Sequence, residues 1–257
     1  MGTIVGDDGA GNKIGVAPEA SWIGCRNMDD GFGVESTYLE CFQYFLAPYP
    51  IGGNQETDGK PEMAPHVINN SWGCPDSEGC RGGEFIEAIR ALHAAGIMVV
   101  VSAGNDGPDC ASVNSPPAIY ADDVISVGAM NSSVSGIAYF SSRGPSTYTN
   151  GLAPTIAAPG ENIRSALSGS PNSYGRLSGT SMAGPHLAGV VALLWSAKPE
   201  LIGDIERTKD VIYKSAKPMT SQQTCGNFPG SQIPNAVFGY GLVDVYNAIK
   251  SVTTEEK

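Results

Sequence analysis

The sequence predicts an α/β protein built on a mostly parallel, open sheet with helices on both faces. Residues 97–101 form a continuous apolar run, which is typical of a strand buried on both faces of a parallel sheet. An amphipathic segment, 84–95, precedes this run and ends at Gly96, a common helix stop. Strand-like and helix-like segments alternate along this part of the chain, and this order favours right-handed crossovers between parallel strands.

The remaining elements follow from their apolar patterns. Apolar runs predict three further strands, at 21–26, 66–70 and 124–128. Helical spacing of apolar residues, together with start and stop signals, predicts four further helices, at 35–46, 181–198, 205–216 and 244–249. Short extended pieces between turns are expected at 139–145 and 157–160, and the last residues, 253–257, should fray.

The composition predicts a single domain over residues 1–257. No linker, charge run or repeat divides the chain, and 33 Gly, 18 Pro and 16% charged residues are typical of a loop-rich globular protein. A net charge of −11 with only 15 Lys and Arg argues against a nucleic-acid surface. No apolar window of about 18 residues exists, so no membrane span is expected, and the N-terminus lacks the basic start of a signal peptide.

Six cysteines leave several pairings open. Cys74 and Cys80 lie in a loop of Pro, Asp, Ser and Gly and could close a short disulfide. Metal sites usually space such pairs by about two to four residues, so zinc is not expected. For Cys25 and Cys41, free buried thiols remain an alternative, and the connectivity cannot be read from the sequence.

The most specific stretch is 179–189, which reads Gly-Thr-Ser-Met-Ala-Gly-Pro-His-Leu-Ala-Gly and runs into an apolar segment. It places the Ser181 hydroxyl at the positive end of a buried helix. The stretch resembles the nucleophile motif of the subtilisin-like serine peptidases, whose catalytic serine falls on Ser181. The alternative role for Ser181 is a helix N-cap. An α/β-hydrolase elbow is disfavoured, because Ala183 stands where that motif requires glycine.

Two further segments resemble the same family. Residues 102–107 read Ser-Ala-Gly-Asn-Asp-Gly, and Asn105 falls on the family's oxyanion donor, a role in which a preorganised amide stabilises developing negative charge. Residues 68–73, Ile-Asn-Asn-Ser-Trp-Gly, resemble the family's substrate strand, which binds extended peptide through main-chain hydrogen bonds. The alternatives are a turn former at Asn105 and a core strand ending in a turn. The resemblance implies these substrate-binding residues: Ser71, Trp72, Gly73, Ser102, Ala103 and Gly104, with Trp72 and Gly104 as pocket walls.

A serine nucleophile needs a base and a carboxylate that orients it. None of the three histidines is expected to be the base. His186 lies about 140° around the helix from Ser181, His93 lies near a helix end, and His66 precedes a strand. In the family the base motif is H-G-T-H-x-x-G-T, and only its last part is matched, by residues 2–4, while the Asp motif is missing. The resemblance therefore implies an N-terminally truncated domain whose catalytic Asp and His lie outside the chain.

These observations predict a secreted serine endopeptidase domain that hydrolyses polypeptides through an acyl-enzyme at Ser181, with this chain alone inactive. The alternative is a non-catalytic peptide-binding protein. No cofactor is expected. Calcium is the alternative, because some family members bind it at loop 6–15, although the alternating acidic pattern of a dedicated calcium loop is lacking here. The expected partners are a polypeptide substrate and an N-terminal segment or propeptide. An uncovered sheet edge should make the chain prone to aggregate.

Overall fold

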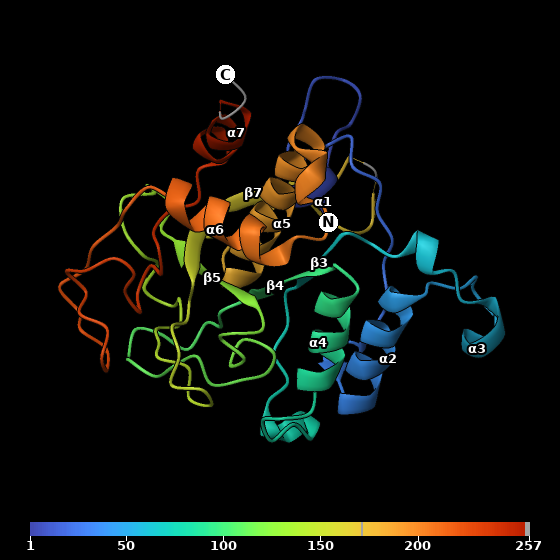
Figure 1. Ribbon diagram of the computed structural model, residues 1–257, viewed down its shortest axis with the longest axis horizontal. Helices are drawn as coiled ribbons and strands as arrows, with labels where there is room; N and C mark the ends of the chain where they lie inside the picture. The colour runs from blue at the N-terminus through green and yellow to red at the C-terminus, as the bar shows by residue number, and fades with distance from the viewer. Residues whose placement is uncertain (171, 255–257) are drawn as a thin grey trace.

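The computed structural model describes residues 1–170 and 172–254, and it has the predicted α/β architecture. Helices lie on both faces of the main sheet (Figure 1). This sheet has four parallel strands in the order β3 (Val67–Asn70), β4 (Met98–Ser102), β5 (Ile125–Met130) and β6 (Ile156–Pro159). The predicted fold class is confirmed, and the extended piece expected at 157–160 lies in the edge strand β6.

The apolar run in β4 explains why two helix layers form. All five residues of this strand are buried. Met98 and Val100 belong to the core beneath α5 (Thr180–Ala197), whereas Val99 and Val101 belong to the core beneath α2 (Glu35–Leu46) and α4 (Ile86–Ala94). Each such side chain contributes about 1.5–3 kcal/mol through its burial. A strand that is apolar on both faces therefore requires a helix layer on each side.

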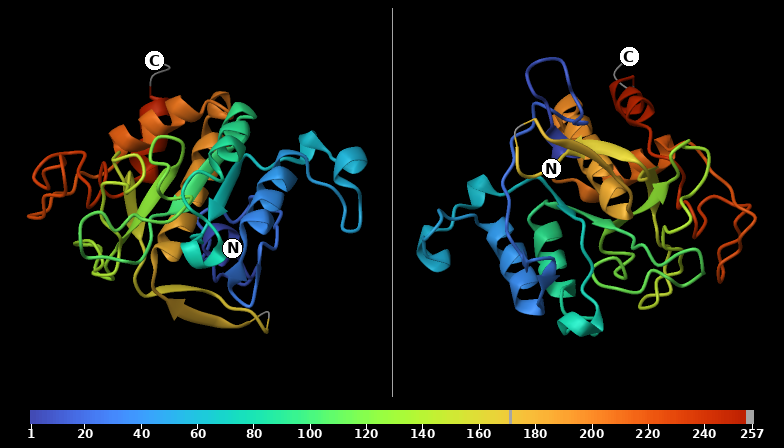
Figure 2. Two further views of the ribbon diagram at one scale, coloured as in Figure 1. Left: turned by 90° about the horizontal axis from the view of Figure 1, so that it is seen from below. Right: turned by 180° about the vertical axis from the view of Figure 1, so that it is seen from behind.

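The other elements extend these layers. Near α5 lie α1 (Gly2–Val5), α6 (Ile205–Ser215) and α7 (Val245–Thr253). Short 3₁₀ turns occur at Pro61–Met63, Asp76–Glu78 and Pro199–Leu201. Two antiparallel hairpins stand apart from the main sheet, β1 (Met28–Asp29) with β2 (Phe32–Gly33) and β7 (Ile163–Ala166) with β8 (Tyr174–Leu177). Figure 2 shows the β7–β8 hairpin and the short helix α3 (Gln55–Asp58) projecting from the body of the molecule.

Most predicted helix bounds agree with the structure, but the strand predicted at 21–26 is wrong. That segment has no strand partner, and Trp22 within it is 62% exposed. An apolar run becomes a strand only when a neighbouring strand satisfies its backbone groups, and none lies beside this one. At the other end, α7 continues to Thr253 where fraying was predicted, and positions 255–257 lie outside the described residues. None of the described helices has the length and apolar character to cross a membrane.

The six cysteines form three disulfides, Cys25–Cys41, Cys74–Cys80 and Cys110–Cys225. The Cys74–Cys80 pair predicted from the loop composition is confirmed. The free-thiol alternative for Cys25 and Cys41 is wrong: their disulfide ties the segment before β1 to α2. The Cys110–Cys225 bond closes a much longer loop, with a sequence separation of 115 residues.

Replacing both Cys74 and Cys80 by alanine is expected to lower the free energy of unfolding by about 2 kcal/mol. The expectation follows from the entropy that a disulfide of this short separation, six residues, removes from the unfolded chain. Urea unfolding followed by tryptophan fluorescence measures the change. Ser77→Ala, an exposed change in the same loop, is the matched control and should leave the midpoint unaltered. An equal midpoint for the double variant would contradict the expectation.

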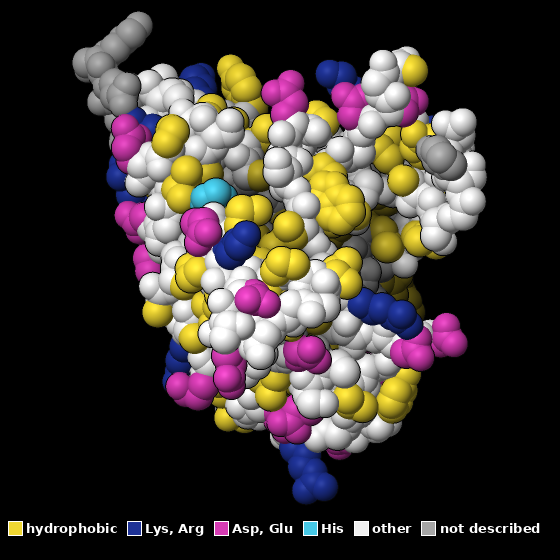
Figure 3. Space-filling view, turned by 90° about the vertical axis from the view of Figure 1, so that its right-hand side faces the viewer, with side chains coloured by type: hydrophobic (Ala, Val, Ile, Leu, Met, Phe, Trp, Pro, Cys, Tyr) yellow, Lys and Arg dark blue, Asp and Glu magenta, His cyan; other side chains and the backbone are white. Residues whose placement is uncertain are grey.

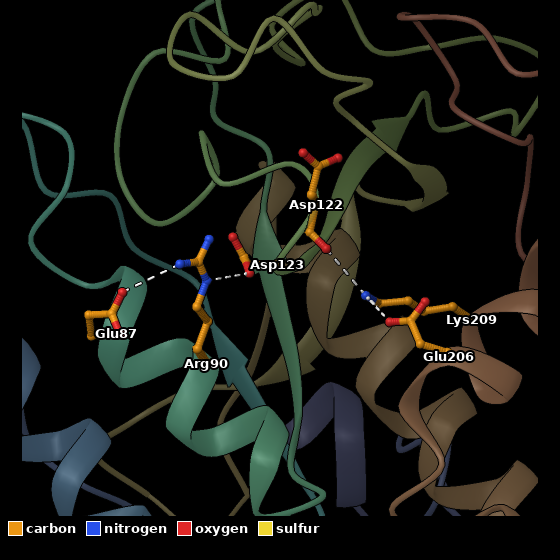
Figure 4. Close-up of polar contacts among 6 residues, drawn as sticks. All are labelled: Glu87, Arg90, Asp122, Asp123, Glu206 and Lys209. Carbon is orange, nitrogen blue, oxygen red and sulfur yellow. Dashed lines mark hydrogen bonds and ion pairs between the residues drawn. The ribbon is translucent and has the colours of Figure 1, made fainter.

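Charged residues tie the turn before β5 to helices on both faces (Figure 4). Arg90 on α4 lies 3.1 Å from Asp123 and 3.4 Å from Glu87. Lys209 on α6, only 8% exposed, lies 2.9 Å from Glu206 and donates to the Asp122 carbonyl oxygen. The more exposed pairs contribute little to stability, so the bonds of buried Lys209 matter most here.

His93, near the end of α4, should make stability depend on pH. Its Nε2 is buried and has no hydrogen-bond partner among the described residues. Burial, followed by the charge of Lys209, lowers the pKa of His93, while Asp123 and Glu206 act in the opposite direction. Because the folded pKa lies below the ordinary value of 6.5, the unfolded chain binds more protons between these two pKa values. The free energy of unfolding is therefore expected to rise with pH through this window.

Urea titrations between about pH 5 and 8 measure this slope. His93→Gln is expected to make the rise shallower, because glutamine does not titrate. Burial also lowers the pKa of His186, so part of the slope should persist. The exposed His66 provides the control variant, His66→Gln. Identical slopes in the His93→Gln variant and the wild type would refute the assignment.

Candidate active site

Ser181 lies in the first turn of α5, at the edge of the sheet where the parallel strands end. Gly179 is the N-cap of this helix, so the alternative role of Ser181 as an N-cap is wrong. The Ser181 side chain is half-buried, and its Oγ donates to the Ser71 carbonyl oxygen at 3.3 Å. In return, Ser71 Oγ donates to the Ser181 carbonyl oxygen at 3.1 Å. This reciprocal pair joins the end of β3 to the start of α5.

Pro185 explains why the Ser181 carbonyl is available. In a regular helix that carbonyl would accept from the N–H of the residue four positions later, which is Pro185 and has no N–H. The Ser71 hydroxyl supplies the missing donor, and the Asn69 side-chain amide donates to Ser71 Oγ at 2.9 Å. The proline of the motif therefore helps fix the nucleophile's backbone without breaking the helix.

Asn105 lies in the loop after β4, next to the same helix end. Its Oδ1 accepts from the Thr180 backbone N–H at 2.8 Å and from Thr180 Oγ1 at 3.0 Å. Thr180 is fully buried, and its Oγ1 also accepts from the Gly104 N–H at 3.2 Å. With Oδ1 held in this way, the Nδ2 donor has no hydrogen-bond partner in the described part of the chain, and Asn105 is exposed. Its amide can therefore donate to a ligand.

The two expected substrate segments leave the sheet side by side, because Asn70 pairs with Val101 in parallel register. In the first, Ser71 and Trp72 are half-buried and Gly73 is exposed. One face of Trp72 stacks on Tyr38 of α2 with ring centroids 4.0 Å apart. The second segment has two buried residues followed by a partly exposed one, Ser102, Ala103 and Gly104.

No histidine contacts Ser181 Oγ in the described residues, as the sequence predicts. His66 precedes β3, at the opposite end of that strand from Ser71, and packs edge-on against Trp195. His186 Nδ1 lies 2.8 Å from the Met182 carbonyl oxygen within α5, and burial lowers the pKa of this histidine. The chain as described thus contains a nucleophile and an oxyanion donor without a base beside them.

Loop 6–15 does not fit a calcium ion. The Asp7 and Asp8 carboxylates accept backbone N–H groups of the loop itself, and Lys13 Nζ lies 3.7 Å from Asp7. Asn12 Oδ1 accepts from Arg164 at 2.8 Å. A cation thus already lies beside a candidate ligand, and the described chain has no group of three His, Cys, Asp or Glu side chains that could hold a metal.

The profile of the subtilase family, Peptidase_S8, matches residues 1–241. The chain belongs to the subtilase family. Bacillopeptidase F of Bacillus subtilis (strain 168) is 38% identical over 261 residues, which cover 98% of this chain and 16% of that protein. Serine protease AprX of the same organism is 30% identical over 269 residues, covering 95% of this chain and 54% of that protein. This subtilase chain therefore spans only part of the length of both relatives.

Solved structures show the same fold. A protease of Pseudoalteromonas arctica PAMC 21717 has a TM-score of 0.67 at 27% identity, covering 92% of this chain and 64% of that one. The S41 psychrophilic protease has a TM-score of 0.70 at 25% identity, covering 95% and 75%. Membership of the subtilase family makes this chain a serine peptidase domain by descent, with a polypeptide as the class of substrate.

Two residues of the site were not singled out by the sequence interpretation. Thr180 and Pro185 both lie inside the nucleophile motif, so the motif itself was the available signal. Their roles depend on partners far away in the chain, Asn105 and Ser71, and become visible only when the loops are placed side by side.

Proposed function

We propose that this subtilase chain carries the nucleophile and the oxyanion site of a serine endopeptidase, while its base and carboxylate come from residues outside 1–257. The observation that carries the proposal is the bond from the Thr180 N–H to Asn105 Oδ1 at 2.8 Å. This bond turns the Asn105 Nδ2 donor outward beside Ser181. A side-chain amide fixed at a helix N-terminus next to a serine is an arrangement suited to stabilising an oxyanion.

The chemistry is acyl transfer. The base removes the Ser181 Oγ proton as Oγ bonds to the carbonyl carbon of the substrate, whose oxygen takes the negative charge. Asn105 Nδ2 and the Ser181 backbone N–H, one of the unpaired donors of the first helical turn, donate to that oxygen. The C–N bond then breaks, and the base returns the proton to the leaving amine. Water hydrolyses the ester through the same steps in reverse, so the reaction needs no cofactor.

The substrate would bind as an extended strand along Ser71, Trp72 and Gly73 and the facing residues Ser102, Ala103 and Gly104. Main-chain hydrogen bonds would provide affinity for many sequences, and side-chain pockets would provide selectivity. Trp72 and Gly104 are the proposed pocket walls. The three disulfides support a secreted protein, because such bonds persist in oxidising compartments.

The free edge of β3 favours an external source for the base. In the described residues β3 pairs only with β4, and its other edge ends at Ser71, the contact of Ser181. A further strand on this edge would bring its own side chains beside Ser181. Figure 3 shows apolar side chains in and around a hollow on the side of the molecule where α2 and α3 lie, and a supplementary segment could cover them.

A serine-phosphonylating reagent tests the proposal. The protein made from the complete reading frame is expected to be labelled once, at Ser181, and Ser181→Ala should abolish the label. The purified 257-residue chain should remain unlabelled and inactive. Rapid peptide cleavage by that chain would refute an external base, and so would an upstream coding sequence that lacks in-frame H-G-T-H and D-[ST]-G motifs.

A non-catalytic peptide-binding protein is the second candidate, favoured by the absence of a histidine beside Ser181 in the described residues. It predicts peptide binding without labelling in both forms of the protein. A stoichiometric label on Ser181 would eliminate it. An N-terminal segment or propeptide is a proposed partner under the first candidate only.

A further inference from the structure

Ser142 contacts both chain neighbours of Asn105. Its backbone N–H donates to the Gly104 carbonyl oxygen at 3.0 Å. Its Oγ accepts from the Asp106 backbone N–H, also at 3.0 Å. Ser142 is fully buried, so both bonds are shielded from water. The peptide groups before and after the proposed oxyanion donor are therefore held by a single residue.

The loop fits closely against this serine. Gly104 has φ +107°, a conformation that favours glycine, and a Cβ at this position would lie 2.7 Å from Ser142 Oγ. One residue further along, the Gly107 N–H donates to the Phe140 carbonyl oxygen at 2.8 Å. Residues 140–142 thus lie along the loop 104–107 and leave its backbone little freedom.

Thr180 and Ser142 fix different parts of Asn105. Thr180 holds the side-chain oxygen, whereas Ser142 holds the backbone from which the side chain projects. A carboxamide is aimed only when both its anchor and its tip are fixed. If the backbone moves, Nδ2 moves with it, and a misplacement of about 1 Å can lower a rate by about 10²-fold.

We propose that Ser142 is a positioning residue that aims the Asn105 Nδ2 donor at the oxyanion. This inference deepens the proposed function and rests on it. Ser142 does not touch the substrate. It acts through Asn105, by accepting the Asp106 N–H, and its hydroxyl should therefore affect kcat more than KM.

Ser142→Ala removes the acceptor, and Ser141→Ala is its matched control. Ser141 is equally buried, and its Oγ also accepts a backbone N–H at 3.0 Å, but from Ala129 in β5. The two variants thus lose the same kind of bond on different sides of one segment. Ser142→Cys is the second variant, in case the alanine variant does not fold. A thiol fills the space of the hydroxyl but accepts hydrogen bonds only weakly.

The first measurement uses the 257-residue chain and needs no catalysis. The ¹⁵N heteronuclear NOE of the Asn105 side-chain amide reports its motion on the ps–ns timescale. We expect a lower NOE in Ser142→Ala, a smaller decrease in Ser142→Cys, and the wild-type value in Ser141→Ala. A wild-type NOE in both Ser142 variants would overturn the proposal. This result stands whether or not the protein is an enzyme.

The second measurement uses the protein from the complete reading frame. Ser142→Ala is expected to lower kcat about 10-fold at nearly constant KM, part of the loss that removal of the donor itself causes. In an Asn105→Ala background the same change should cost nothing further. An equal loss in both backgrounds would show that Ser142 does not act through Asn105, and the proposal would fail. Complete inactivity of the wild-type protein would instead refute the proposed function, and the NOE would still decide the role of Ser142.

Discussion

Replacing Ser181 by alanine in the protein from the complete reading frame is expected to lower kcat by about 10⁶-fold. The magnitude is that known for loss of the nucleophile or the base in subtilisin, a member of this family. The physical reason is that no other group can form the acyl-enzyme: the Ser181 hydroxyl lies at the start of α5 beside Asn105, and water is a far poorer nucleophile. Single-turnover hydrolysis of a chromogenic peptide measures the loss.

KM should change little, because the alanine variant keeps the backbone of the substrate segments. Ser178→Ala is the matched control: Ser178 is an exposed serine three positions before Ser181, and its Oγ accepts only from the Asn162 N–H at 2.9 Å. It should retain full activity. Residual activity of Ser181→Ala above about one per cent would contradict the assignment of the nucleophile, because the oxyanion site and binding alone provide far less than that.

The sheet and its helices could be predicted because their signals are local. The run in β4 is apolar at every position that faces a core, and α2 begins at Glu35 and ends at Leu46, the bounds its apolar spacing predicts. Periodicity requires no knowledge of distant partners. The segment 21–26 failed for the same reason, because its apolar residues say nothing of whether a neighbouring strand exists.

The site could be predicted only as far as motifs reach. The positions of Ser181 and Asn105 follow from two motifs, but the bonds that orient them do not. Thr180 and Asn105 lie 75 residues apart, and Ser71 and Ser181 lie 110 apart, so each bond exists only once the sheet brings its loops together. The disulfide partners of Cys25 and Cys110 were unpredictable in the same way.

Asn105→Ala is expected to lower kcat about 10²–10³-fold at nearly constant KM, a magnitude known from the oxyanion donor of subtilisin. Alanine removes the Nδ2 donor but leaves the Ser181 backbone N–H, so part of the oxyanion stabilisation should persist. It also leaves the buried Thr180 hydroxyl without its acceptor, and a stability loss of about 1–3 kcal/mol should accompany the kinetic one. Steady-state kinetics and urea unfolding on the same preparation separate the two effects.

Asn114→Ala is the control, because Asn114 is an exposed asparagine in the loop after Cys110, and its Oδ1 accepts only from the neighbouring Ser115 hydroxyl at 3.3 Å. Its kcat should match the wild type. Asn105→Asp sharpens the test further: the carboxylate can still accept from Thr180 but offers no donor, and its charge repels the oxyanion. We therefore expect kcat of Asn105→Asp to be at or below that of the alanine variant. A near wild-type kcat for the aspartate would mean that Asn105 is needed for its bond to Thr180 and not for donation to the oxyanion.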